Sequence, residues 1–516
     1  LGSEFMPPLN EGSILYMPTT LPGLSVGEAE RILQTQNRIL KSFPEVETVF
    51  GKAGRAETST DPSPFSMIET TIMLKDESEW RKKERWYSFL PGFLHVFLRP
   101  IWSDTRTMEE LTAEMNEAMQ FPGWVNAYTM PIKARIDMLS TGIRTPVGIK
   151  IQGDDLKQIE ELGVHLEHIL KDIRGTRSVY AERVSAGSFI DFDLKRHELA
   201  RHGLSVEDAL MVLSAAMGGA DLTTTIEGRE RYSVHVRYGR SYRESLSELQ
   251  RVLIPLPSGA QIPLGQLADL VIRSGPGMIR NENGLRSGYV YIDVSGRDIG
   301  SYVEEARAVV QEKLKRPPGY NIEWSGQYEN MQRVRSRLAV ILPLTILIIF
   351  LLLYFNTKSK FRALLVLSTL PLSIMGAVWI LTILDYNLSI AVWVGMIALL
   401  GLDAETSIFM IMFLDLSYAD WKDSGRLKTE DDLLECVIEG AVKRIRPKLM
   451  TVMTGFLGLM PILWSTGTGA DVMKRIAAPM VGGLVTSFAL ELLIYPVVYY
   501  LYRKREMEKQ MEAKHR

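Results

Sequence analysis

Asp403 and Glu405 are two carboxylates inside an otherwise apolar stretch, residues 388–413. A carboxylate at the depth of a bilayer is unfavourable by several kcal/mol unless it faces other protein or water. Residues of this kind usually mark a pathway for ions or protons. The pair therefore indicates transport machinery.

Three methionines in the first part of the chain, Met17, Met67 and Met138, could do a second kind of chemistry. Thioether sulfur is a soft ligand that suits Cu(I) and Ag(I) and binds hard or borderline divalent ions poorly. A methionine beside apolar neighbours is more often core packing. Charged residues typical of a hydrated cleft surround the three in the sequence, namely Asp61, Glu69, Arg135, Asp137 and Arg144. From the residues alone, metal binding and packing both stay open.

The last third of the chain contains apolar segments of the length that a membrane crossing requires, about 20 residues. They are residues 338–356, 363–384, 388–413, 449–466 and 476–502. The first carries no charge, and a soluble core helix seldom stays apolar on every face over that length. The pattern predicts five crossings.

Basic residues lie in alternate connections between these segments, which predicts the orientation of the spans. The cytoplasmic set is Lys358, Lys360, Arg362, Lys443, Arg444, Arg446, Lys448, Arg503, Lys504 and Arg505. The opposite connections are nearly free of positive charge, although Lys474 and Arg475 weaken the contrast. Residues 1–337 are then external.

An external amino end without an export signal, followed by an odd number of spans, favours a piece of a longer polypeptide, its C-terminal half. The alternative reads Leu1–Phe5 as a remnant of cloning.

Composition excludes several classes of function. With 59 basic and 61 acidic residues the formal charge is -2, so no nucleic-acid partner is expected. The single cysteine, Cys436, excludes an internal disulfide framework and a thiolate metal cluster. No nucleophile and base arrangement, phosphate loop or hydrolytic metal motif is visible, so neither an enzyme nor a cofactor is expected.

The external region alternates between strand-like and helix-like periodicity, which predicts an α+β fold with repeated βαβ units. Each unit is a strand, a helix and a strand: 12–19, 26–42 and 45–53; 147–152, 155–173 and 177–183; 288–294, 300–315 and 320–325. Ser25 and Glu28 mark the start of the first helix. Residues 187–278, with a strand at 232–238 and a helix starting at Ser205, form an inserted subdomain.

The stretch 78–102 combines aromatic and basic residues. It is predicted either to pack as a helical hairpin on its own domain or to lie on a membrane surface.

Several ordered motifs resemble one family. They are GSEFMPPLNEGSILYMPTTLPGLSV, MIETTIMLK, ARIDMLSTGI, GLDAETSIFMIM, RIRPKLMTV and VMKRIAAPM. Together they are similar to the C-terminal half of the heavy-metal efflux branch of the resistance-nodulation-division (RND) transporters, most of all to its copper/silver exporters. The resemblance spans nearly the whole chain.

The resemblance implies roles for particular residues. Met17, Met67 and Met138 correspond to the family's metal site, and Met473 to a further methionine on the metal path. The residues that would line the cleft are Asp61, Glu69, Arg135 and Arg144. Glu405 and Lys448 match the proton relay, and Asp403 would share the proton or cap a helix. A positive-inside anchor is the alternative for Lys448.

The resemblance also implies the domains. They are a first porter subdomain (6–140), a second porter subdomain (141–186 and 279–330), a docking subdomain (187–278), five transmembrane helices (338–502) with a cytoplasmic link at about 414–448, and a cytoplasmic tail (503–516). The implied fold is a set of ferredoxin-like βαβ repeats plus an all-α transmembrane bundle.

The implied function is proton-driven efflux of Cu(I) and Ag(I), which are substrates rather than cofactors. The implied setting is the inner membrane of a Gram-negative bacterium, with a large periplasmic region. The protein would work there as a homotrimer, with a periplasmic adaptor (membrane fusion) protein, an outer-membrane channel protein and membrane lipid as its partners. Two alternatives stay open: an exporter of Zn, Co, Ni or small molecules with the same fold, and a membrane-anchored metal-binding or assembly module.

Three features depart from the family pattern. Asp221 stands where the copper exporters have a methionine, Glu491 in the last span has no counterpart, and the relay's other acidic partner lies outside this chain.

Overall fold

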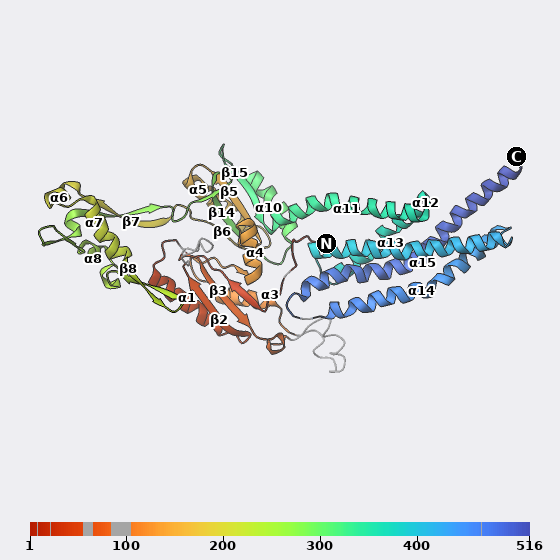
Figure 1. Cartoon of the computed structure of the whole chain (residues 1–516), viewed down its shortest axis with the longest axis horizontal. Coiled ribbons are helices and arrows are strands. Elements are labelled where there is room, and N and C mark those ends of the chain that lie inside the picture. Colours follow the sequence, from red (N-terminus) through yellow and green to blue (C-terminus); the bar gives the residue numbers. More distant parts are fainter. Residues whose placement is uncertain (8, 21, 55–64, 84–104, 466, 516) are drawn as a thin grey trace. The chain divides into compact units, whose positions relative to one another are not determined.

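The computed structural model describes residues 1–516 except 8, 21, 55–64, 84–104, 466 and 516 (Figure 1). The chain forms two compact units. The larger joins Leu1–Glu182 to Arg280–Arg516, and the smaller is Arg183–Ile279. The smaller unit is therefore an insertion in the chain of the larger one.

The first sheet of the larger unit has the strand order β2-β3-β1-β4, and all neighbouring strands are antiparallel. Its elements are β1 (Ser13–Tyr16), α1 (Val26–Lys41), β2 (Val46–Ala53), β3 (Ile68–Leu74), α3 (Met108–Ala118) and β4 (Tyr128–Thr129). The predicted positions of β1, α1 and β2 agree with the structure. However, β3 lies between β1 and β2, so these two strands are not neighbours.

Helices α1 and α3 cover only one face of this sheet. The Ser25 side chain caps α1 by accepting a hydrogen bond from the Glu28 backbone N–H. The buried side of α1 recurs every three or four residues, at Ala29, Ile32, Gln36 and Leu40. The core that forms on this face includes Ile14, Tyr16, Leu40, Ile72, Leu111 and Met115. Neither α1 nor α3 covers the opposite face of the sheet.

The second sheet repeats the topology of the first. Its elements are β5 (Val147–Gly153), α5 (Leu156–Lys171), β6 (Thr176–Ala181), β14 (Leu285–Val294), α10 (Ile299–Lys313) and β15 (Asn321–Gly326). The antiparallel order is β6-β14-β5-β15, and β13 (Arg280–Glu282) also pairs with β14. If the four main strands of each sheet are numbered along the chain, with β13 left aside, their order in space is 2-3-1-4 in both sheets. Helix α4 (Pro131–Thr141) links the two sheets along the chain.

The smaller unit contains three antiparallel strand pairs. They are β7 (Gly187–Leu194) with β12 (Ala268–Gly275), β8 (Ala220–Glu227) with β9 (Glu230–Val236), and β10 (Leu253–Pro255) with β11 (Gln261–Pro263). The helices are α6 (Arg196–Arg201), α7 (Val206–Leu213), α8 (Leu246–Gln250) and α9 (Leu264–Leu267). Ser205 and Asp208 form a capping box at α7, as its sequence predicts. The hydrophobic core includes Leu199, Leu213, Ile254 and Leu264, so this unit has a core of its own.

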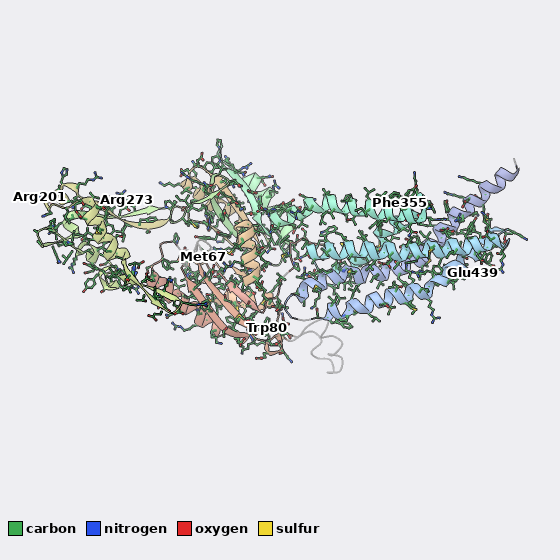
Figure 2. The ribbon with its side chains drawn as sticks, in the orientation of Figure 1. Met67, Trp80, Arg201, Arg273, Phe355 and Glu439 are labelled. Carbon is green, nitrogen blue, oxygen red and sulfur yellow. The ribbon has the colours of Figure 1, made fainter. Side chains whose placement is uncertain are left out.

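Only the start of the aromatic and basic stretch 78–102 lies within the described residues. Trp80, labelled in Figure 2, is buried in the core of the first sheet, and its indole N–H donates to the Lys75 carbonyl oxygen at 2.9 Å. Arg81 donates to Glu45 and to Glu114. This end of the stretch therefore packs on its own domain, and the rest of the prediction concerns residues outside the described ones.

Five helices among the described residues are long and apolar enough to cross a membrane. They are α11 (Gln327–Thr357), α12 (Lys360–Ile383), α13 (Ile390–Asp423), α14 (Glu430–Trp464) and α15 (Ala470–His515), which Figure 1 shows in cyan to blue. Helix α11 follows β15 directly, so the second sheet leads straight into the first of these helices.

Most of the predicted link at 414–448 is helical. Helix α13 continues to Asp423, and a capping box of Thr429 with Asp432 starts α14 at Glu430. Leu433, Cys436 and Val437 are buried in the same core as α13 residues, which stabilises this extension. The connection between the two helices is residues 424–429. The predicted tail from residue 503 is also helical, as a continuation of α15.

Two glycines allow α12 and α15 to pack closely. A Cβ atom built on Gly482 of α15 would lie 2.4 Å from the Gly376 carbonyl oxygen of α12, and the reverse distance is also 2.4 Å. Small residues let helix backbones approach in this way inside a membrane.

We expect Gly482→Ala to destabilise the helix bundle by about 1–3 kcal/mol, because the added methyl group would force the two backbones apart. The measurement is unfolding of the purified chain in detergent micelles. Gly458→Ala is the matched control, since nothing lies within 4 Å of a Cβ atom at that position of α14. Equal stability of the two variants would contradict close packing at Gly482.

Candidate metal site and buried charges in the membrane helices

Met17 and Met67 project from the same face of the first sheet. The register pairs Tyr16 with Thr70 and Thr19 with Met67, so Met17 falls opposite Glu69. Residues directly opposite each other, and every second residue along a strand, share a face. The strands continue beyond their named ends, since the Ile68 N–H donates to the Pro18 carbonyl oxygen at 3.3 Å. Met67 is therefore the diagonal cross-strand neighbour of Met17.

This face is the one that α1 and α3 leave free, because Ile14 and Tyr16 point to the opposite side. Met17 is 1 % exposed, and Met67, labelled in Figure 2, is partly exposed. Glu69 lies on the same face and forms an ion pair with Lys52 at 3.1 Å. The face thus combines two thioethers with a carboxylate.

Helix α4, which carries Met138, contacts β1. Glu11 caps the start of α4, accepting hydrogen bonds from the backbone N–H groups of Ile132 at 2.8 Å and Lys133 at 3.0 Å. Beyond its other end, the Arg144 guanidinium donates to the Thr19 hydroxyl. Met138 lies midway between these two anchors and is partly exposed. Met17, Met67 and Met138 thus belong to three separate segments, and the segment that carries Met138 contacts β1.

The charged residues that the sequence places around the cleft have different positions. Glu69 belongs to the methionine face, whereas Arg135 is exposed on α4. Arg144 is buried, hydrogen-bonded to Thr19 and stacked 4.3 Å from the centre of the Tyr291 ring, so it joins the two sheets. Asp61 lies outside the described residues.

Two further residues of the predicted metal path lie on other elements. Met473 is 50 % exposed in the first turns of α15. Asp221, where the resemblance predicts a methionine in the copper exporters, lies on β8 of the smaller unit and pairs with the His235 imidazole at 2.8 Å. The hydrogen bond to the Asp221 carboxylate raises the pKa of His235.

Buried ionisable groups lie in the second sheet and in α4. Asp293 of β14 lies 3.4 Å from Arg177, and burial raises the pKa of Asp293 to about 6, although Arg177 and Lys133 oppose the shift. Burial lowers the pKa of Lys133 and raises that of Asp137, which accepts a hydrogen bond from Gln327 at 3.1 Å.

The Asp293 shift predicts a pH dependence of stability. Because its pKa rises from 3.8 to about 6 on folding, the folded chain binds more protons than the unfolded chain between these values. Stability should fall by about 2–3 kcal/mol as the pH rises through this window. Urea unfolding followed by tryptophan fluorescence should show this slope, and Asp293→Asn should flatten it. Asp154→Asn, at an exposed loop position, should keep the slope; a slope unchanged by Asp293→Asn would contradict the assignment.

In the membrane helices, Asp403 is buried and Glu405 is exposed on the surface of this chain. Asp403 accepts hydrogen bonds from the Ser373 hydroxyl at 2.7 Å and from the Ser487 hydroxyl. The two carboxylates therefore have different surroundings, although they are only two positions apart in the sequence.

Lys448 is fully buried and forms an ion pair with Glu491, which is also fully buried. This overturns the alternative of Lys448 as a positive-inside anchor, because its ammonium group contacts a carboxylate inside the bundle rather than the membrane surface. The error arose because α14 begins at Glu430, which places Lys448 well inside the helix. Sequence reasoning missed Glu491 as the partner. Its signal was a lone acidic residue in an apolar span, the same signal that singled out Asp403.

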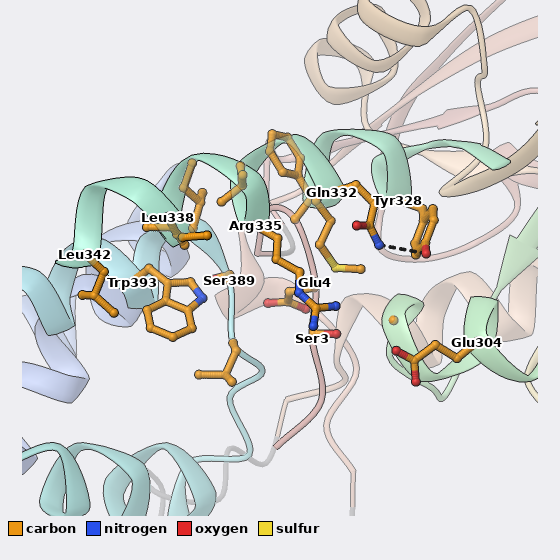
Figure 3. Close-up of a pocket in the computed structure, with 17 residues that line it drawn as sticks. Ser3, Glu4, Glu304, Tyr328, Gln332, Arg335, Leu338, Leu342, Ser389 and Trp393 are labelled. Atoms are coloured by element: carbon orange, nitrogen blue, oxygen red, sulfur yellow. Dashed lines mark hydrogen bonds between the residues drawn. The ribbon is translucent and has the colours of Figure 1, made fainter. Parts of the chain in front are cut away.

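A cavity of about 460 Å³ lies where the N-terminal segment meets the beginnings of α11 and α13 (Figure 3). Glu4, Arg335 and Trp393 line it, together with apolar residues of α11. Glu4 forms an ion pair with Arg475 of α15, and burial raises the pKa of Glu4 in spite of that pairing. The N-terminal segment is thereby attached to the start of the last helix.

Comparison with known proteins identifies the architecture. The sequence profile of the AcrB/AcrD/AcrF family matches residues 1–503. The chain belongs to this family. Its members are efflux transporters rather than enzymes.

Individual relatives agree with this membership. The chain is 40% identical over 513 residues to the putative cation efflux system protein SilA of Salmonella typhimurium, covering 99% of this chain and 47% of SilA. It is 39% identical over 503 residues to the cation efflux system protein CusA of Escherichia coli (strain K12), covering 97% and 46%. For the cobalt-zinc-cadmium resistance protein CzcA of Cupriavidus metallidurans, the identity is 33% over 513 residues, covering 98% and 45%.

A solved heavy metal efflux pump has a TM-score of 0.82 and 29% identity, covering 98% of this chain and 48% of the pump. The family resemblance seen in the motifs is thus confirmed, and the fold is that of an RND transporter. The chain spans about half the length of the relatives it matches.

Proposed function

We propose that the chain belongs to a proton-driven exporter of Cu(I) and Ag(I), in which Met17, Met67 and Met138 bind the metal. The observation that carries the proposal is the shared sheet face of Met17 and Met67, together with the attachment of α4, the helix of Met138, to Glu11 and of Arg144 to Thr19. Thioethers favour soft monovalent metals. These thioethers form the substrate site.

The position of these methionines argues against simple packing. Met115 and Met119 show what a packing methionine looks like here, since both are fully buried in the core under α1 and α3. Met17 instead lies on the opposite face, and Met67 and Met138 are partly exposed, as a site that loads and releases metal requires. Met473 takes the metal onward by ligand exchange, and Glu69, Arg135, Arg144 and Asp61 shape the cleft.

For the energy source, we propose a proton relay that includes Glu405, Lys448 and Asp403. A carboxylate that binds and releases a proton beside an ammonium group changes the local charge and can bias a conformational equilibrium. The exposed position of Glu405 suits contact with a further part of the protein, and the buried positions of Asp403 and Lys448 suit protein-internal transfer.

We further propose that the two sheets are ferredoxin-like porter subdomains, 6–140 and 141–186 with 279–330, since both have the same split βαβ topology. Residues 187–278 form a docking subdomain, as the separate core of the unit 183–279 supports. The complete pump is a homotrimer in a Gram-negative inner membrane, joined to a periplasmic adaptor and an outer-membrane channel. The five apolar helices support a membrane location.

Export of divalent metals is the second candidate, which the 33% identity to CzcA favours. Titration of the purified chain with Ag(I) and Zn(II) tests the choice. We expect Ag(I) to bind more tightly by at least about 100-fold, since thioethers are poor ligands for Zn(II). Tighter Zn(II) binding would favour the divalent exporter. Ag(I) binding without metal transport in proteoliposomes of the longer protein would favour the third candidate, a membrane-anchored metal-binding module.

A further inference from the structure

Glu491 of α15 is the centre of a buried hydrogen-bond network that joins four membrane helices. Its Oε2 atom accepts from the Lys448 ammonium group of α14. Its Oε1 atom accepts from the Ser407 hydroxyl of α13 at 2.8 Å and lies 2.7 Å from the Ser487 hydroxyl. The network continues to Asp403 of α13, and from there to Ser373 of α12 at 2.7 Å. Asp403, Lys448 and Glu491 are each at most 1 % exposed.

Ser487 bridges the two carboxyl groups, since its Oγ atom is hydrogen-bonded to Oδ1 of Asp403 as well as to Oε1 of Glu491. A serine hydroxyl has one hydrogen and can donate only one hydrogen bond. An ionised carboxylate can only accept. For both contacts to be hydrogen bonds, Ser487 must donate to one carboxyl group and accept from the other, which must then carry a proton.

The surrounding donors indicate which carboxyl group carries it. Both oxygens of Glu491 already accept, one from Lys448 and the other from Ser407. Glu491 is therefore the charged partner. Asp403 has a free proton position on Oδ1, because the Ser373 contact uses Oδ2. The hydrogens then run from Asp403 to Ser487 to Glu491, and every hydroxyl in the chain has an acceptor.

The other charged groups on the neighbouring helices do not change this assignment of the proton to Asp403. Glu405 of α13 is exposed on a different side of its helix. Arg444 of α14 is buried one helical turn from Lys448, but its guanidinium stacks on the rings of Phe409 and Phe413, at 5.1 and 5.7 Å from their centres. Among the described residues, Lys448 alone gives either carboxyl group a charged hydrogen-bond partner.

We propose that Asp403, Ser487 and Glu491 form a proton-exchange site of their own, with the resting proton on Asp403. In the exchange step, the Asp403 proton passes to Ser487 Oγ while the Ser487 hydrogen passes to Glu491 Oε1. Asp403 becomes the carboxylate, Glu491 becomes the neutral acid, and the total charge is unchanged. Lys448 then faces an uncharged partner, so the position of one proton decides whether α14 and α15 are tied by an ion pair.

This inference deepens the proposed proton-driven transport and rests on it for its purpose, but the protonation itself can be measured without any metal. The test is infrared spectroscopy of the chain in lipid nanodiscs at neutral pH, where a protonated carboxyl group gives a C=O stretch apart from the ionised carboxylates. We expect a buried carboxylic acid band that Asp403→Asn removes and that Glu435→Gln, at an exposed position of α14, leaves at full area. Ser487→Ala should keep the band and shift its frequency, because the acid loses its acceptor.

A band that persists in Asp403→Asn, or that is absent from the unaltered chain at neutral pH, would overturn the proposal. So would a band that sodium chloride weakens and choline chloride does not, since a sodium ion would then compete for the site. Asparagine has nearly the shape of the protonated acid, so Asp403→Asn should fold. Its Ag(I) affinity, measured in parallel, should equal that of the unaltered chain. If the unaltered chain shows the band but does not bind Ag(I), the proposed substrate is wrong and the proton site remains supported.

Discussion

Replacing Glu491 by alanine is expected to destabilise the membrane helices by about 3–5 kcal/mol, because Lys448 would be left as an unpaired charge in the bundle. Both partners are fully buried, so water cannot replace the lost carboxylate. The measurement is unfolding of the chain in detergent micelles. Glu405→Ala is the control: its side chain is exposed, and we expect a change within about 0.5 kcal/mol.

A second variant separates the cost of an orphaned charge from the cost of a cavity. When Lys448→Met is added to Glu491→Ala, no unpaired charge remains, and much of the lost stability should return. If the double variant is less stable than Glu491→Ala alone, the destabilisation comes from lost packing and the ion pair is not its cause.

Replacing Met17, Met67 and Met138 together by leucine is expected to weaken Ag(I) binding by at least about 100-fold. Loss of a partner that only orients a ligand weakens metal binding by about 10–100-fold, and loss of the ligands themselves should exceed that. Leucine keeps the volume and removes the sulfur, so the sheet face should stay folded. The measurement is competition titration with Ag(I).

Met115→Leu is the matched control for the trio, since Met115 lies in the core on the other side of the sheet. It should leave the Ag(I) affinity unchanged. If the triple variant keeps the Ag(I) affinity of the unaltered chain, the three methionines have only a packing role. The proposed substrate would then be wrong.

Sequence patterns predicted those features that depend on residues close together in the chain. Ser25 with Glu28 predicted the start of α1, and Ser205 predicted the start of α7, because a cap involves residues three positions apart. The five apolar helices were visible for the same reason, since hydropathy is a property of a continuous segment. The ends of α13 and α14 were missed, because amphipathic extensions beyond a span depend on burial against another helix.

The sequence by itself determined that this chain has five apolar helices, alternating strands and helices outside them, and family motifs that mark Met17, Met67, Met138, Glu405 and Lys448. Only the tertiary structure decided which side chains meet. Antiparallel register placed Met67 diagonal to Met17, and helix packing paired Lys448 with Glu491, 43 residues away. The physical reason is that ligation and ion pairing act over a few ångströms in space. Separation along the chain carries no information on that distance until strands and helices have packed.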